Sequence, residues 1–162
     1  MNITRRQNLG LIGGALAASA APTLVTSSDA VHDVEMLNHH PDNKRELMVF
    51  YPDIVMVQPG DVIRFLATDR NHNSQARDDM LPEGAEPWRS KIGKEFELTL
   101  EVEGAYGYFC TPHKSYGMVG LILVGDVSGN YETLKTVRQR SKSKGRFQDI
   151  FARADALLAK QA

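Results

Sequence analysis

The chain has 162 residues, 42% of them hydrophobic and 24% charged, which is typical of one soluble domain built around a single core. Its 19 basic and 20 acidic residues give a formal net charge of -1 at pH 7. A protein whose main partner is nucleic acid needs a marked basic excess, so this balance argues against that class.

The first 30 residues have the layout of an export signal. Arg5 and Arg6 form a basic start, and residues 9–21 are a short apolar run rich in glycine and alanine. A helix that spans a membrane needs about 20 apolar residues, so this run is too short to be an anchor. We therefore predict a signal that is removed and a mature chain without a membrane anchor.

The export route and the cleavage site stay open on sequence grounds. Residues 4–9 resemble a twin-arginine signal, although Asn8 stands where phenylalanine is usual, and the ordinary Sec route is the alternative. Small residues allow cleavage after Ala20 or after Ala30. Either site predicts an exported mature protein.

From residue 31 to residue 126 the chain is a series of short segments rich in β-branched and aromatic residues, separated by turn signals. Within one of them Phe96, Leu98 and Leu100 alternate with polar residues, the pattern of a half-buried strand. Residues 58–61 fit a type II turn, with proline second and glycine third. The spacing predicts a β-sandwich or barrel. The expected strands are 47–50, 54–57, 61–67, 95–102, 106–109 and 119–124.

Two other segments break this pattern. Residues 69–90 form one long polar connection, and long loops are usually functional or disordered. After Gly129, Asn130 is expected to cap a helix that runs to about Arg140. The basic run 138–146 is interpreted as a solvated loop. A second helix is expected to pack an apolar stripe on the sandwich, formed by Phe147, Ile150, Phe151, Ala154, Leu157 and Leu158.

The only cysteine is Cys110, so the chain cannot form an internal disulfide. An exposed free thiol would be oxidised in a periplasm, which favours either an inert buried cysteine or a metal ligand. Cys110, His113 and Met118 follow one another at C-x2-H-x4-M spacing between two predicted strands, with Pro112 stiffening the turn. A fourth donor must come from elsewhere, and His72, at the start of the long connection, is the natural candidate.

Two imidazoles, one thiolate and a weak axial thioether are the ligand set of a blue-copper site. Zinc is the main competitor, but thioether is not among the usual zinc ligands. The donor set therefore predicts one copper ion, held by His72, Cys110, His113 and Met118.

Several further stretches support a family resemblance and are more specific than the ligand motif, which alone would also allow an amicyanin or a plastocyanin. From about Val34 to its end the chain resembles the pseudoazurins, a family of single-copper cupredoxins. The matching stretches are residues 36–38, 48–50, 58–61, 72–73, 80–86, 90–92 and 119–120, together with the C-T-P-H and G-M motifs of the ligand loop.

The resemblance implies an all-β fold, a Greek-key cupredoxin-like sandwich of about eight strands over residues 31–128. Two C-terminal α-helices over residues 129–162 would pack on it. It also implies that Asn73 ties together the two loops that carry the copper ligands, one containing His72 and the other running from Cys110 to Met118. It further implies that Met48 packs near His113.

The same resemblance implies a periplasmic, monomeric carrier of single electrons rather than an enzyme. Its partners would be redox proteins such as a copper nitrite reductase or a cytochrome c. The ligand loop departs from its relatives at Lys114 and Tyr116. With Arg89 and Lys91, these two residues are expected to form a docking rim around His113 that suits an acidic partner.

Two alternatives belong to other functional classes. A copper enzyme would need a second metal site, and the remaining histidines, His32, His39 and His40, are not arranged as a cluster. A copper storage or delivery protein would favour exposed tracts rich in methionine or cysteine, which the chain lacks. Electron carriage is therefore the preferred hypothesis, with copper storage or delivery as its alternative.

Overall fold

The structure is a computed structural model, and it describes residues 30–160. The predicted export signal lies almost entirely outside this range. Within the described part, no helix is both long and apolar enough to cross a membrane.

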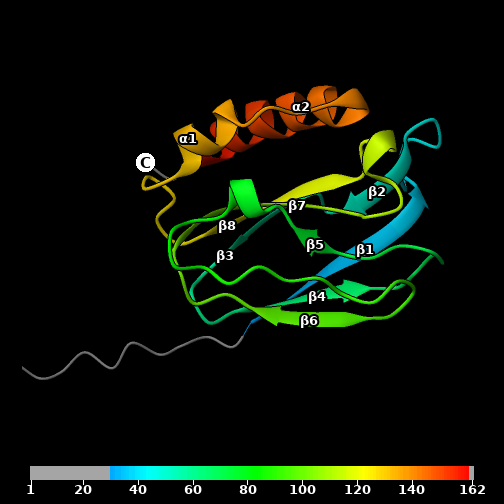
Figure 1. The fold of residues 1–162 in the computed structure, drawn as a ribbon, viewed down its shortest axis with the longest axis horizontal. Helices are drawn as coiled ribbons and strands as arrows, with labels where there is room; N and C mark the ends of the chain where they lie inside the picture. The colour runs from blue at the N-terminus through cyan, green and yellow to red at the C-terminus, as the bar shows by residue number, and fades with distance from the viewer. Residues whose placement is uncertain (1–29, 161–162) are drawn as a thin grey trace, which may run out of the picture.

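Within residues 30–160, eight β-strands form two sheets packed face to face, with two α-helices laid across one of them (Figure 1). One sheet has the strand order β2-β1-β4-β6 and the other β3-β8-β7-β5. The strands are β1 (Val31–His39), β2 (Leu47–Tyr51), β3 (Ile54–Val57), β4 (Val62–Leu66), β5 (Gln75–Ala76), β6 (Phe96–Thr99), β7 (Gly104–Phe109) and β8 (Val119–Val124).

Both sheets mix parallel and antiparallel pairs. Strand β1 lies antiparallel to β2 and parallel to β4, while β8 lies antiparallel to β7 and parallel to β3. Parallel neighbours need crossover connections, so the chain passes repeatedly between the two sheets. The predicted all-β sandwich of about eight strands with two C-terminal helices is confirmed.

The two strands absent from the sequence prediction are β1 and β5. Strand β1 carries the charged Asp33 and Glu35 on its outer face, which masks the inward alternation of Val34 and Met36. Strand β5 has only two residues and lies inside the long connection at residues 69–90, which also contains a short 3-10 helix, η1 (Asp78–Met80). That connection is therefore less irregular than expected.

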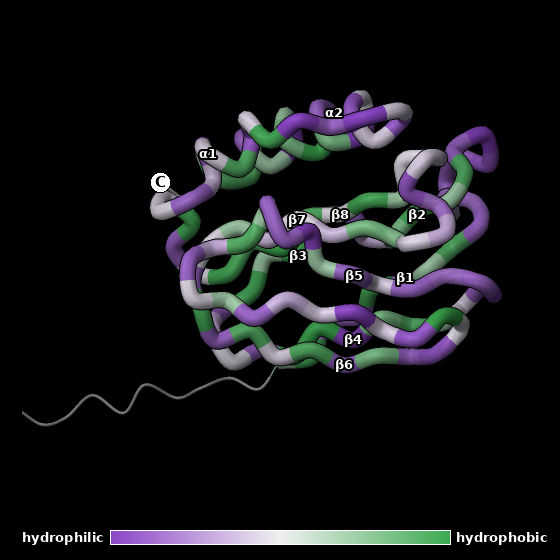
Figure 2. The backbone as a smooth tube through the Cα atoms, in the orientation of Figure 1, coloured by the Kyte–Doolittle hydropathy of each residue, from purple (hydrophilic) through white to green (hydrophobic). Residues whose placement is uncertain are grey.

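The sheet β3-β8-β7-β5 is covered on both of its faces, as the burial of strand β8 shows. All six of its residues are buried. Ile122 and Val124 face the core between the sheets, whereas Val119, Leu121 and Leu123 face the helices. Strands β3 and β8 are accordingly mainly hydrophobic in Figure 2, while hydrophilic residues are visible along α2 above them. A strand buried on both faces is a continuous apolar run rather than an alternating one.

The half-buried pattern of β6 and the turn before β4 are confirmed. Phe96 and Leu98 are partly buried against the core, and the residues between them are exposed. In the turn, the Asp61 N–H donates to the Gln58 carbonyl at 3.1 Å and Gly60 has a φ of 91°. A positive φ at the third turn position is the condition that defines a type II turn.

The helical segment differs from the prediction in its boundaries. Helix α1 (Tyr131–Thr136) is shorter than expected, and α2 (Ser141–Leu158) begins within the basic run that we interpreted as a solvated loop. The apolar stripe of α2 is buried as predicted up to Ala154, whereas Leu157 is 38% exposed and Leu158 is partly buried. The interpretation of residues 141–146 as a solvated loop is wrong, since they form the first turns of α2. Their intrinsic preference for helix is weak, but packing against the ligand loop, described below, stabilises the helical turn.

Asn130 precedes α1 as expected, but its side chain does not cap the helix. Its Oδ1 accepts the Ala105 N–H at 2.8 Å, and its Nδ2 donates to the Ala105 carbonyl at 2.8 Å. The amide thus pairs with β7 like an additional strand residue, which fixes the start of the helical extension to the sheet.

The buried hydroxyl of Tyr108 lowers the stability of the core. Tyr108 is fully buried against Phe50 and Phe65, and its hydroxyl has no hydrogen-bond partner among the described residues. An unsatisfied buried polar group costs about 1–3 kcal/mol. Tyr108→Phe is therefore expected to raise the free energy of unfolding of the copper-free protein by about 1 kcal/mol in urea titrations.

The matched control is Tyr106→Phe. The Tyr106 hydroxyl donates to the Val102 carbonyl, so its loss should lower the free energy of unfolding by about 1 kcal/mol. Equal destabilisation by both substitutions would show that the Tyr108 hydroxyl is satisfied in solution.

Candidate metal centre

His72 is held at the base of the site by strand β1. The loop after β4 is fastened to β1 by Asp69, whose carboxylate accepts the Asn38 N–H at 2.7 Å. His72 is fully buried, and its Nε2 lies 3.0 Å from Asn38 Oδ1. Because an amide oxygen only accepts, Nε2 must carry the proton, which leaves the Nδ1 lone pair of neutral His72 free to bind a metal.

The ligand loop connects β7 to β8 and folds back on itself. The Cys110 N–H donates to the Met118 carbonyl at 2.9 Å, which continues the β7–β8 ladder by one pair. The Met118 N–H donates to the His113 carbonyl at 3.3 Å, and a 3-10 turn, η2 (Lys114–Tyr116), fills the loop. Cys110 and Met118 are both fully buried, so their sulfur-bearing side chains enter the same core cluster.

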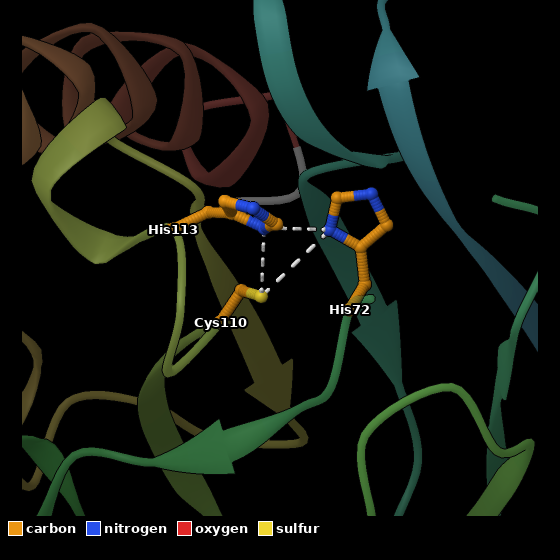
Figure 3. Close-up of side chains that lie close together, drawn as sticks. All are labelled: His72, Cys110 and His113. Carbon is orange, nitrogen blue, oxygen red and sulfur yellow. Dashed lines mark hydrogen bonds between the residues drawn. The ribbon is translucent and has the colours of Figure 1, made fainter. Parts of the chain in front are cut away.

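Three donor atoms from these two segments converge on one point, as Figure 3 shows. His72 Nδ1 and His113 Nδ1 are 3.0 Å apart, and Cys110 Sγ lies 3.8 Å from the first and 3.6 Å from the second. An ion with bonds of about 2.0–2.3 Å to nitrogen and sulfur separates tetrahedral donors by roughly 3.3–3.6 Å. The spacing therefore fits a single ion bound by all three residues.

The site keeps its imidazoles neutral. Burial, followed by the charge of nearby His113, lowers the pKa of His72 to about 4, with Asp69 acting weakly against this. Burial also lowers the pKa of His113. Neutral imidazole is the form that binds a metal, so the site is prepared for an ion at neutral pH.

Cys110 experiences two opposing influences. Burial raises the pKa of its thiol, whereas the backbone N–H groups of Asn73 and His113 lower it. Hydrogen bonds of this kind stabilise a thiolate and reduce its basicity toward a metal. Burial thus disfavours the thiolate, and a bound cation would compensate its charge.

Asn73 is hydrogen-bonded to the start of the ligand loop and to Ser90. The side chain is buried, with Oδ1 accepting the Thr111 N–H at 2.8 Å and Nδ2 donating to the Ser90 carbonyl at 3.2 Å. One amide therefore fixes the His72 segment to the cysteine end of the ligand loop.

The remaining predicted residues lie around the loop. Pro112 is exposed in the ligand loop, and Met48 is partly buried against the core cluster that contains Cys110 and Met118. No described contact joins Met48 to His113, so that expected proximity stays a prediction.

The four predicted docking residues are all exposed: Arg89, Lys91, Lys114 and Tyr116. The Tyr116 ring lies edge-on to His113 with centroids 6.2 Å apart, and Lys114 Nζ lies 5.3 Å from the centroid of the Phe109 ring.

Asn38 contacts His72, although no role was predicted for it; it lies in residues 36–38, one of the stretches that carry the family resemblance. It continues the inward-facing series Val34, Met36, Asn38 along β1. A polar residue in the buried register of a strand needs a partner, and that signal could have identified it.

Comparisons with known proteins agree with this arrangement. Residues 34–125 match the model of the family described as copper binding proteins, plastocyanin/azurin family. A pseudoazurin from Paracoccus pantotrophus is 40% identical over 148 residues, which cover 91% of this chain and 97% of that protein.

Solved pseudoazurin structures are also similar to this chain. One from Methylobacterium extorquens has a TM-score of 0.72 at 38% identity and covers 76% of this chain and 98% of its own. Another, from Hyphomicrobium denitrificans, has a TM-score of 0.71 at 35% identity with the same coverage. The chain therefore belongs to the plastocyanin/azurin family of copper-binding proteins and, within it, to the pseudoazurins.

Proposed function

We propose that this protein carries single electrons at one type 1 copper site, with ligands His72, Cys110, His113 and Met118. The observation that carries the proposal is the convergence of His72 Nδ1, Cys110 Sγ and His113 Nδ1 within 4.8 Å of one another. Met118 supports copper over zinc, because a thioether is a weak axial ligand in blue-copper sites and not a usual zinc ligand.

Copper supplies the Cu(II)/Cu(I) couple that the polypeptide lacks. The protein contributes a rigid, dry set of donors. Asn38 orients His72, Asn73 joins the two segments, and burial of Cys110 and Met118 excludes water. Donors that hold one arrangement in both oxidation states keep rearrangement small. Apolar burial favours the reduced site, which carries one positive charge less, so we expect a high reduction potential.

Electrons would enter and leave through His113. It is partly exposed, whereas His72 and both sulfur ligands are fully buried. The Tyr116 ring lies edge-on to His113, and we propose that the exposed cations of Arg89, Lys91 and Lys114 complete a rim around it. Such a rim suits brief encounters with an acidic redox protein, steered by charge.

The proposed partners are a copper nitrite reductase or a cytochrome c, and the proposed location is the periplasm. Residues 1–30 would direct export, by the twin-arginine or the Sec route, before cleavage after Ala20 or Ala30. Residues 31–128 would then form the copper-binding sandwich and residues 129–162 its helical extension, working as a monomer.

The test is a copper titration followed by stopped-flow kinetics. We expect one equivalent of Cu(II) to produce an intense visible band, which ascorbate bleaches and mixing with an oxidised partner restores. Nitrite reductase and cytochrome c form the two arms. Charge steering predicts that the association rate constant falls about tenfold or more as ionic strength rises from 10 to 200 mM.

Lys114→Glu is expected to lower that association rate constant at low ionic strength, because it reverses one charge beside His113. Lys160→Glu changes the same charge at the end of the chain beyond α2 and should have a smaller effect. Efficient copper transfer to a chelator without electron exchange with either partner would instead identify a storage or delivery protein.

A further inference from the structure

The first turn of α2 lies directly against the turn that carries His113 and Met118. The faded ribbon of α2 is visible beside this turn in Figure 3. Gly117, at the end of the turn, has a φ of 86°, and a Cβ there would lie 3.2 Å from the backbone carbonyl of Lys142. The ligand loop and the helix therefore approach each other backbone to backbone.

One buried hydroxyl connects them. Ser143 is 7% exposed, and its Oγ donates to the Lys114 carbonyl at 2.7 Å. Among residues 30–160, this is the only side-chain hydrogen bond that joins α2 to η2. The other polar contact between them is the exposed Lys142 ammonium, 5.7 Å from the centroid of the Tyr116 ring, which is expected to contribute little.

The Lys114 carbonyl occupies a central position in the ligand loop. It also accepts the Gly117 N–H at 3.0 Å, so one oxygen closes the turn and receives the helix hydroxyl. Lys114 follows His113 directly, and the His113 carbonyl accepts the N–H groups of Tyr116 and Met118. A displacement of the Lys114 carbonyl would consequently move the segment between two of the proposed metal ligands.

We propose that Ser143 is a positioning residue for the metal centre. Its hydroxyl fixes the Lys114 carbonyl, and thereby the placement of His113 and Met118 relative to Cys110 and His72, before any metal binds. The proposal rests on the proposed copper site, and it assigns to the C-terminal helix a part in shaping that site as well as covering the sheet.

The test compares Ser143→Ala with Ser143→Thr, which keeps a hydroxyl, and with Lys144→Ala, an exposed neighbour on the same turn. In the copper-free protein, amide hydrogen exchange at Tyr116 and Gly117 should be about tenfold faster in Ser143→Ala, the effect of losing one hydrogen bond. Ser143→Thr and Lys144→Ala should match the wild type. Because this measurement needs no metal, it tests the contact even if the copper assignment fails.

The second measurement separates positioning from mere stability. In the copper-loaded protein, Ser143→Ala should change the intensity ratio of the two sulfur-to-copper absorption bands and shift the reduction potential, and Ser143→Thr should restore both. Faster exchange with an unchanged band ratio and potential would overturn the positioning role. Unchanged exchange would overturn the contact itself. A wild type that forms no thiolate band would instead refute the proposed function.

Discussion

Replacing Cys110 with serine is expected to remove the intense visible absorption of the copper-loaded protein completely. The colour of a type 1 site arises from charge transfer between a cysteine thiolate and Cu(II), and a hydroxyl cannot supply it. The same substitution should abolish reversible electron transfer. Without the thiolate, the remaining ligands are two neutral imidazoles and a thioether, which cannot compensate the charge of Cu(II) in a buried site. The measurements are a visible spectrum and a voltammogram.

Met118→Leu is the matched comparison. It removes the other proposed sulfur ligand, which is also buried, but keeps the thiolate, so the colour should persist. The reduction potential should rise, because the weak donor that favours Cu(II) is lost. A strong visible band in Cys110→Ser, or a lower potential in Met118→Leu, would contradict the ligand assignment.

The second large effect is expected at Asn73. Replacing it with alanine deprives the Thr111 N–H and the Ser90 carbonyl of their partners in the interior. Each unsatisfied buried group costs about 1–3 kcal/mol, so the loss of both partners should lower the free energy of unfolding of the copper-free protein by about 2–6 kcal/mol. Copper affinity should fall by about 10–100-fold, because the two segments that carry His72 and Cys110 are no longer joined.

Asn43→Ala provides the control, since Asn43 is exposed and bonds only within its own turn, to the Arg45 N–H at 3.3 Å. Its unfolding midpoint in urea and its copper affinity, measured by competition with a chelator of known affinity, should match the wild type. Equal behaviour of both alanine variants would show that the Asn73 bridge contributes nothing in solution.

The sequence was most informative where local chemistry is restrictive. The alternation in β6 and the proline-glycine turn before β4 predict their structures directly, because pleat geometry and positive φ limit which residues fit. The sequence was less informative about the extension after Gly129. Asn130 looks like a helix cap, but its amide pairs with β7, and no local pattern distinguishes these two uses.

By itself, the sequence determined which donors are proposed for the site: one cysteine, a histidine and a methionine at loop spacing, and a second histidine far upstream. Tertiary structure alone decided which atoms meet and what fixes them. Strand β1 brings Asn38 to His72, Asn73 reaches Thr111 across 38 residues, and α2 brings Ser143 to Lys114. Residue type and local spacing determine what a side chain can bind, but the distances between segments far apart in the chain depend on how the whole core packs.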